Sequence, residues 1–209
     1  MIKQAIILCG GEGTRVKEIT GNTPKCLFSI SNRPFIFYII MMCKGIGATD
    51  IVLLARDKAP KFKFFEDGIA DIHKHSGLDF NDSPNGIPLP RGLVRVIGYT
   101  GEGVTEEILS IPKLDDIFIL AQGDQLPIGN WQGFVADGKP KIGIKIIGRD
   151  AGIAILKKEM LIKKEINPLD FKDMRKKLPE YLMLGTVHMG TPEGIRRAIQ
   201  FFDMVVYGQ

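Results

Sequence analysis

The chain has 209 residues, of which 44% are apolar and 25% are charged. These proportions are typical of a soluble globular protein and exclude a disordered or collagen-like chain. The 28 basic and 24 acidic residues leave a small net charge of +4. A chain of this length buries about 70% of its unfolded surface, so we expect one domain over residues 1–209.

The first strand is expected over residues 2–9, where the apolar run from Ala5 to Cys9 ends in glycines, as in strands buried on both faces. A largely buried helix is expected over residues 34–45, from Pro34 to the Lys44-Gly45 stop signal. Residues 76–92 are dense in Gly, Pro and Asn and predict a loop excursion. Further strands are expected over residues 51–55, 93–99, 117–121, 141–147 and 153–156, and further helices over residues 58–65, 105–109 and 192–202.

This alternation of strands and helices predicts the fold class. It is typical of an α/β protein with three layers, a Rossmann-like fold around a mostly parallel central sheet. Ligands of such sheets gather at the carboxyl ends of the strands. No apolar run reaches the about 18 residues of a membrane span, and no cleavage pattern follows the first run, so we expect a cytoplasmic protein without a membrane partner.

The cysteines and the basic residues give little information about the function. Cys9, Cys26 and Cys43 form no C-x-x-C pair, so a disulfide framework or a zinc site is not expected. We expect Cys9 and Cys43 to be reduced core thiols. Residues 157–177 carry eight basic and four acidic residues, which suggests either an anionic partner or a solvated helix face. The segment lacks the interleaved aromatic residues of a nucleic-acid groove, so we expect no nucleic-acid partner.

The most informative stretch follows the first strand. It reads Leu8-Cys9-Gly10-Gly11-Glu12-Gly13-Thr14-Arg15 and is followed by Asn22-Thr23-Pro24-Lys25. Glycines allow backbone N–H groups to approach an anion, and Arg15 and Lys25 can neutralise it. The spacing fits neither a Walker A loop nor a dinucleotide fingerprint. The alternative interpretation is a tight strand-to-helix turn with surface cations.

This stretch resembles the signature of the nucleotidyltransferases that make nucleotide sugars and related activated head groups. The resemblance rests on Gly10, Gly11, Gly13, Thr14, Arg15, Pro24, Lys25, Leu27 and Pro34. It continues more thinly through residues 118–124, 151–153 and 190–193. It implies the nucleotide-diphospho-sugar transferase fold, and a reaction in which an acceptor phosphate attacks the α-phosphorus of a nucleoside triphosphate and pyrophosphate leaves.

The resemblance also implies roles for individual residues. Arg15 would stabilise the departing pyrophosphate, and Lys25 would contact the phosphates being joined. The partners would be a nucleoside triphosphate and a sugar 1-phosphate, or another phosphomonoester such as phosphocholine. Assembly into a homo-oligomer stays open. The nucleotide would be bound by Leu8, Gly10, Gly11, Glu12, Gly13 and Thr14.

Asp124 is the expected metal ligand. It follows a buried strand and Gly123, where a carboxylate has no hydrophobic reason to be. Mg²⁺ is bound by one or two carboxylates together with phosphate oxygens, and we expect Mg²⁺ as the cofactor. The alternative is that Asp124 only caps a turn.

Position 188 departs from the resemblance, because related enzymes usually carry a second metal-binding aspartate where His188 stands. An imidazole is a poor ligand for Mg²⁺. Either Asp124 and water hold the metal, with His188 at the acceptor phosphate, or catalysis is impaired and the chain is a regulatory subunit that binds nucleotide or sugar phosphate. A glycosyltransferase is a third hypothesis, but the Asp-x-Asp motif expected for it is missing.

Overall fold

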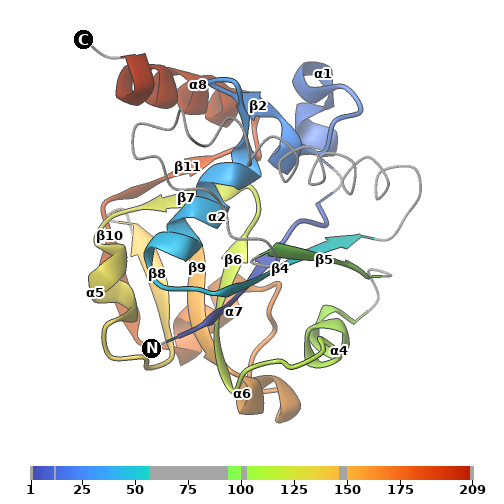
Figure 1. Ribbon diagram of the computed structural model, residues 1–209, viewed down its shortest axis with the longest axis vertical. Helices are drawn as coiled ribbons and strands as arrows, with labels where there is room; N and C mark the ends of the chain where they lie inside the picture. Colours follow the sequence, from blue (N-terminus) through green and yellow to red (C-terminus); the bar gives the residue numbers. More distant parts are fainter. Residues whose placement is uncertain (1, 12, 57–93, 100–102, 146–149, 208–209) are drawn as a thin grey trace.

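The computed structural model describes residues 2–11, 13–56, 94–99, 103–145 and 150–207 (Figure 1). The helix expected over residues 58–65 and the loop expected over residues 76–92 lie outside these ranges. In the described ranges, no helix combines the length and the apolar character needed to cross a membrane.

A seven-stranded sheet forms the centre of the molecule, in the order β10-β8-β9-β6-β1-β4-β5. Strand β1 lies parallel to β4 and β6, β4 lies parallel to β5, and β8 lies parallel to β10. Only β9, among these seven, runs antiparallel to its neighbours β6 and β8. The strands are β1 (Gln4–Leu8), β4 (Asp50–Arg56), β5 (Val94–Tyr99), β6 (Ile117–Gln122), β8 (Lys141–Lys145), β9 (Asp150–Lys157) and β10 (Glu180–Met183). The prediction of a mostly parallel sheet is confirmed.

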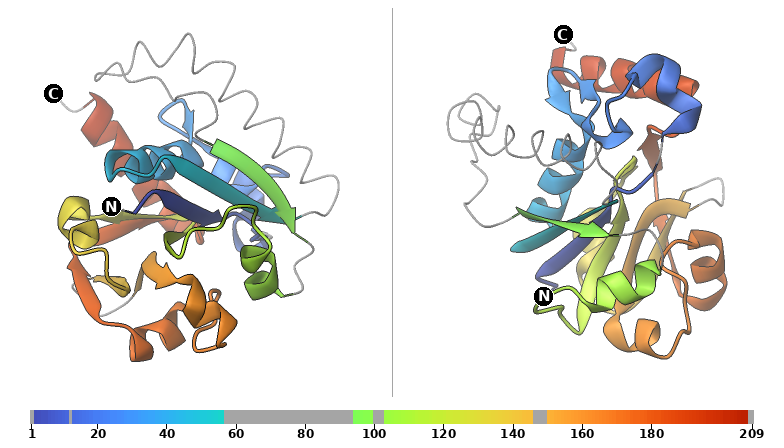
Figure 2. Two further views of the ribbon diagram at one scale, coloured as in Figure 1. Left: turned by 60° about the horizontal axis from the view of Figure 1, so that its bottom comes forward. Right: turned by 90° about the vertical axis from the view of Figure 1, so that its right-hand side faces the viewer.

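Helices cover both faces of this sheet (Figure 2). Alternate residues of each strand face opposite cores: Ala5 and Ile7 pack in the core that contains α2 and α8, and Ile6 packs in the core that contains α4, α6 and α7. The longer helices are α2 (Phe35–Gly45) and α8 (Pro192–Tyr207). The shorter ones are α1 (Lys17–Thr20), α4 (Val104–Leu109), α5 (Trp131–Val135), α6 (Lys158–Ile162) and α7 (Phe171–Lys177). The three-layer prediction is therefore confirmed.

Two small sheets complete the architecture. Strands β7 (Gln125–Ile128) and β11 (Gly185–His188) pair antiparallel, and β2 (Ser29–Ile30) and β3 (Arg33–Pro34) form a hairpin. Two short 3₁₀ helices, η1 (Thr14–Val16) and η2 (Lys25–Leu27), follow the first strand. The sequence analysis predicts none of these pieces, since strands of two to four residues leave too short a periodic pattern.

Helix α8 extends beyond its expected end at residue 202. It begins with Pro192, and Thr191 Oγ1 accepts a hydrogen bond from Gly194 N at 3.0 Å, which caps its first turn. Ile195, Ala198 and Phe202 are buried at helical spacing. The cap fixes where α8 begins, a few residues after β11 ends at His188.

Candidate active site

The site lies where the chain order of the central sheet reverses. From β1 the chain continues to β4 and β5 on one side and then returns to β6 on the other side. The last residues of β1 and β6, Leu8 and Gln122, are register partners, and Gly123 N donates to the Leu8 carbonyl oxygen at 2.9 Å. Open α/β sheets bind ligands at such switch points. The loops after β1 and β6 therefore leave the sheet side by side.

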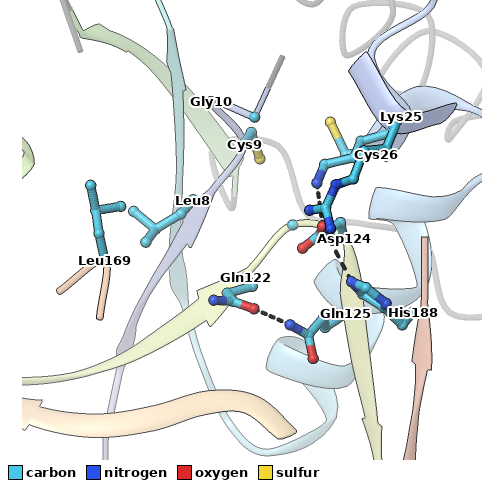
Figure 3. A pocket seen from close by; sticks show the side chains of 13 residues that line it. Leu8, Cys9, Gly10, Lys25, Cys26, Gln122, Asp124, Gln125, Leu169 and His188 are labelled. Carbon is cyan, nitrogen blue, oxygen red and sulfur yellow. Dashed lines mark hydrogen bonds and ion pairs between the residues drawn. The ribbon is translucent and has the colours of Figure 1, made fainter. Parts of the chain in front are cut away.

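A cavity of about 430 Å³ opens between these loops (Figure 3). It brings together most of the residues that the sequence analysis selects. They are Leu8, Gly10, Gly11, Arg15, Lys25, Asp124 and His188. The other lining residues are Cys9, Cys26, Gln122, Gly123, Gln125 and Leu169. Gly13 and Thr14 are not among the lining residues, and Glu12 lies outside the described residues.

The glycine loop lies close to Lys25. A Cβ at Gly11 would stand 3.0 Å from Lys25 Cε, a closer approach than side chains ordinarily make. A glycine at this position lets the lysine side chain lie against the loop backbone. Thr14 begins η1 and Lys25 begins η2, so two successive turns place Arg15 and Lys25 on the wall of one cavity.

Lys25 and Asp124 form an ion pair in the cavity. The Lys25 ammonium donates to Asp124 Oδ2, and the two side chains are 17% and 15% exposed. The structure thus brings the basic residue of the first motif onto the carboxylate that follows β6. Asp124 does more than cap a turn, because its partner lies 99 residues earlier in the chain.

The small β7–β11 sheet places His188 beside Asp124. His188 is the register partner of Gln125, and Met189 N donates to the Asp124 carbonyl oxygen at 2.8 Å. His188 Nε2 lies 3.8 Å from Asp124 Oδ2, and the imidazole is 33% exposed (Figure 3). A Cβ at Gly190 would collide with the His188 ring, so the glycine is needed for this ring position.

Comparisons with known proteins support the resemblance to the nucleotidyltransferases. Residues 4–76 match the family described as Nucleotidyl transferase. The chain is 35% identical over 81 residues to a probable glucose-1-phosphate cytidylyltransferase of Bacillus subtilis, a match that covers 38% of this chain and 31% of the relative. It is 32% identical over 81 residues to a choline-phosphate cytidylyltransferase of Streptococcus pneumoniae, covering 38% of this chain and 35% of the relative. The matches thus span about a third of these relatives.

A solved structure, UTP-bound UGPase from Acinetobacter baumannii, superposes with a TM-score of 0.71 at 15% identity and covers 98% of this chain and 94% of that one. The chain is related to the nucleotidyltransferases. The family model matches residues 4–76, and the fold similarity extends over nearly the whole chain. The predicted nucleotide-diphospho-sugar transferase fold is confirmed by this similarity.

Several residues that line the cavity of this chain are not predicted from the sequence. Gln125 donates through Nε2 to Gln122 Oε1 on the cavity wall. Leu169, with 56% of its surface exposed, lines the cavity from the segment between α6 and α7, whereas none of the basic residues of segment 157–177 lines it. Gln122 ends a buried strand, which could have identified it. Leu169 stands 45 residues after Asp124, in a loop without any pattern that points to the site.

The expectation that Cys9 is a core residue is wrong in part. Cys43 is fully buried, and burial raises the pKa of its thiol to about 12. Cys9 is half-buried instead and lines the cavity, where it comes directly after the last residue of β1. Desolvation of its thiol, with the Cys26 side chain beside it, raises the Cys9 pKa well above its ordinary value. Both thiols are therefore neutral at neutral pH.

The donor atoms around Asp124 fit a divalent cation that is held by one carboxylate. Asp124 Oδ1 accepts no hydrogen bond from the described residues, and the cavity beside it has room for phosphate oxygens and water. Mg²⁺ takes one or two carboxylates and completes its shell with such oxygens. Among the described residues, no group of three His, Cys, Asp or Glu side chains surrounds a common point. A metal here would depend on its substrate for several ligands.

Proposed function

We propose that the chain transfers a nucleoside monophosphate from a nucleoside triphosphate to a sugar 1-phosphate or a similar phosphomonoester, with release of pyrophosphate. One observation carries the proposal: the glycine loop, Arg15, Lys25 and Asp124 meet in one cavity at the switch point of the sheet. The relatives named for cytidylyl transfer to glucose 1-phosphate and to choline phosphate support it. These relatives favour an enzyme over a regulatory subunit that only binds nucleotide or sugar phosphate.

In this reaction an oxygen of the acceptor phosphate forms a bond to the α-phosphorus, and the bond from that phosphorus to the bridging oxygen of pyrophosphate breaks. The protein contributes mainly by positioning the groups and by neutralising charge. The backbone of Gly10 and Gly11 approaches the triphosphate, and Arg15 holds the departing pyrophosphate through its planar fork. No general base is needed, because an ionised phosphate oxygen is already a nucleophile.

Lys25 has the central role among the protein groups. Its ammonium lies on Asp124 in the structure and lines the cavity, so a bound phosphate competes for it directly. We propose that Lys25 donates to an oxygen of the α-phosphate, where negative charge builds as the acceptor attacks. A divalent cation on Asp124, expected to be Mg²⁺, would neutralise further phosphate charge.

Pyrophosphate release tests the proposal. Each of the four nucleoside triphosphates is incubated with glucose 1-phosphate, mannose 1-phosphate or phosphocholine in the presence of Mg²⁺ or Mn²⁺. We expect release that depends on one base and one acceptor. Lys163→Gln, directly after the end of α6, alters an exposed ion pair with Glu159. It serves as the matched control for lysine loss and should behave like wild type. Nucleotide binding without release under every combination would favour the regulatory subunit instead.

A further inference from the structure

A metal ion bound by Asp124 would serve the reaction proposed above, so its ligands are inferred on the basis of that proposed function. The pair formed by Asp124 and His188 presents one carboxylate oxygen and one imidazole nitrogen to a common space. Nε2 is the ring nitrogen that faces Oδ2, at 3.8 Å. This distance is too long for a hydrogen bond, but it is within the range of an ion pair when the imidazole is protonated.

Two ligands of one metal ion stand about 3 to 3.5 Å apart when each bond is 2.0–2.2 Å long. A movement of the imidazole or the carboxylate by less than about 1 Å would bring Nε2 and Oδ2 into that range. The His188 side chain is 33% exposed and borders the cavity, which leaves room for such a movement.

The backbone around His188 holds the ring at this place. His188 is paired with Gln125 in the β7–β11 sheet, and Gln125 directly follows Asp124. Gly190 lies under the ring, and Gly194 in the first turn of α8 lies so close to the His188 carbonyl oxygen that a Cβ would collide with it. The imidazole is thus placed by two packed elements and not by a flexible loop.

The Asp124 carboxylate already attracts a cation in the structure, the ammonium of Lys25, on the oxygen that His188 faces. Phosphate groups in the cavity would draw Lys25 toward themselves and leave this oxygen for a metal. An imidazole suits first-row transition metals, whereas Mg²⁺ prefers oxygen ligands only.

We propose that Asp124 and His188 bind one divalent transition-metal ion together, with Nε2 as a direct ligand, so that the site prefers Mn²⁺ or Co²⁺ to Mg²⁺. The remaining ligands are phosphate oxygens and water. His188 then acts as a metal ligand at the position where the resemblance leads one to expect a carboxylate, and its presence changes the selectivity of the site instead of removing its activity.

Electron paramagnetic resonance of Mn²⁺ tests this without requiring turnover. Mn²⁺ is titrated into the wild-type chain alone and in the presence of inorganic tripolyphosphate, which supplies phosphate oxygens without a base. We expect the pulsed spectrum of bound Mn²⁺ to show coupling to an imidazole nitrogen. Competition with Mg²⁺ should show a preference for Mn²⁺ of about tenfold or more. No bound Mn²⁺ in either mixture, or bound Mn²⁺ without nitrogen coupling, would overturn the proposal.

Two variants extend the test. His188→Asp should lose the nitrogen coupling and bring the affinities for Mn²⁺ and Mg²⁺ within a few-fold of each other, while Lys163→Gln should keep both wild-type properties. An unchanged preference in a folded His188→Asp chain would contradict direct ligation and would favour a contact of His188 with the acceptor phosphate. The wild-type spectrum decides the matter if the variant does not fold. Turnover with Mg²⁺ but no nitrogen coupling would contradict the transition-metal site and leave the proposed function intact. Nitrogen coupling without pyrophosphate release would support the transition-metal site and contradict the proposed function.

Discussion

Lys25 and Asp124 form an ion pair on the cavity wall, one coming from the turn after the glycine loop and the other from the loop after β6. Both side chains are largely buried, so removal of either one leaves the other charge without its partner. This ion pair links the glycine-loop side of the proposed site to the end of β6 and gives each residue an effect on the other.

The first prediction concerns the two basic residues of the amino-terminal motif. Arg15→Ala and Lys25→Ala should each lower kcat/KM by about 100-fold, the effect of losing one preorganised donor to phosphate charge. Steady-state pyrophosphate release measures the effect, and circular dichroism shows whether the fold is intact. Near-normal turnover in both folded variants would contradict the roles given to them.

The second prediction concerns Asp124. Asp124→Asn should abolish most turnover, because the amide keeps the shape of the side chain but loses the charge that holds a cation. Asp137→Asn is the matched control, since the half-exposed Asp137 forms an ion pair with the largely buried Lys141 and does not line the cavity. Activity that is equal in chelator and in added divalent cation would contradict the metal role.

The third prediction concerns the basic segment. Lys177 contacts Asp173 Oδ2 at 2.6 Å and the Glu165 carbonyl oxygen at 2.7 Å, so it is engaged on its own surface. Lys176→Gln combined with Lys177→Gln should leave the KM for the acceptor within a few-fold of wild type. A large rise in KM that grows with salt would instead place the segment at the acceptor or at a polyanionic partner.

The sequence predicts the elements with long periodic patterns. The run that ends at Gly10 becomes β1, and the apolar stretch after Pro34 becomes α2. It does not predict that β9 is antiparallel, because a strand buried on both faces shows the same apolar run in either direction. The resemblance marks position 188, but only the β7–β11 pairing explains how His188 reaches Asp124. Leu169 could not be predicted, because a loop residue is brought to the cavity by tertiary packing alone.

The fourth prediction concerns stability and uses three neighbouring strands. Arg95 on β5 donates two hydrogen bonds to Asp50 on β4, at 2.8 and 2.7 Å, and Gln4 on β1 donates a third at 2.6 Å. The hydrogen bonds from Arg95 hold the pKa of Asp50 below its ordinary value of 3.8. The carboxylate therefore stabilises the fold above that pH, and the contribution is lost as the pH falls through the lowered pKa.

Asp50→Asn should lower the free energy of unfolding by about 1 kcal/mol at neutral pH, since the pair is one-third exposed and partly screened by solvent. Urea titrations of wild type and variant at a series of pH values measure the difference. It should shrink as the pH falls below 3.8. A difference that stays constant over the whole range would show that the effect does not come from the charge of Asp50.

Transfer of the α-phosphate tests the central claim most directly. The chain is incubated with a nucleoside triphosphate that carries a label on the α-phosphate and with an acceptor phosphomonoester, and the products are separated. Nucleotidyl transfer predicts that the label appears in a diphosphate-linked product that contains the acceptor, together with one unlabelled pyrophosphate for each product formed. Label found only in free nucleoside monophosphate, or retained in the triphosphate with every base and acceptor, would contradict the account.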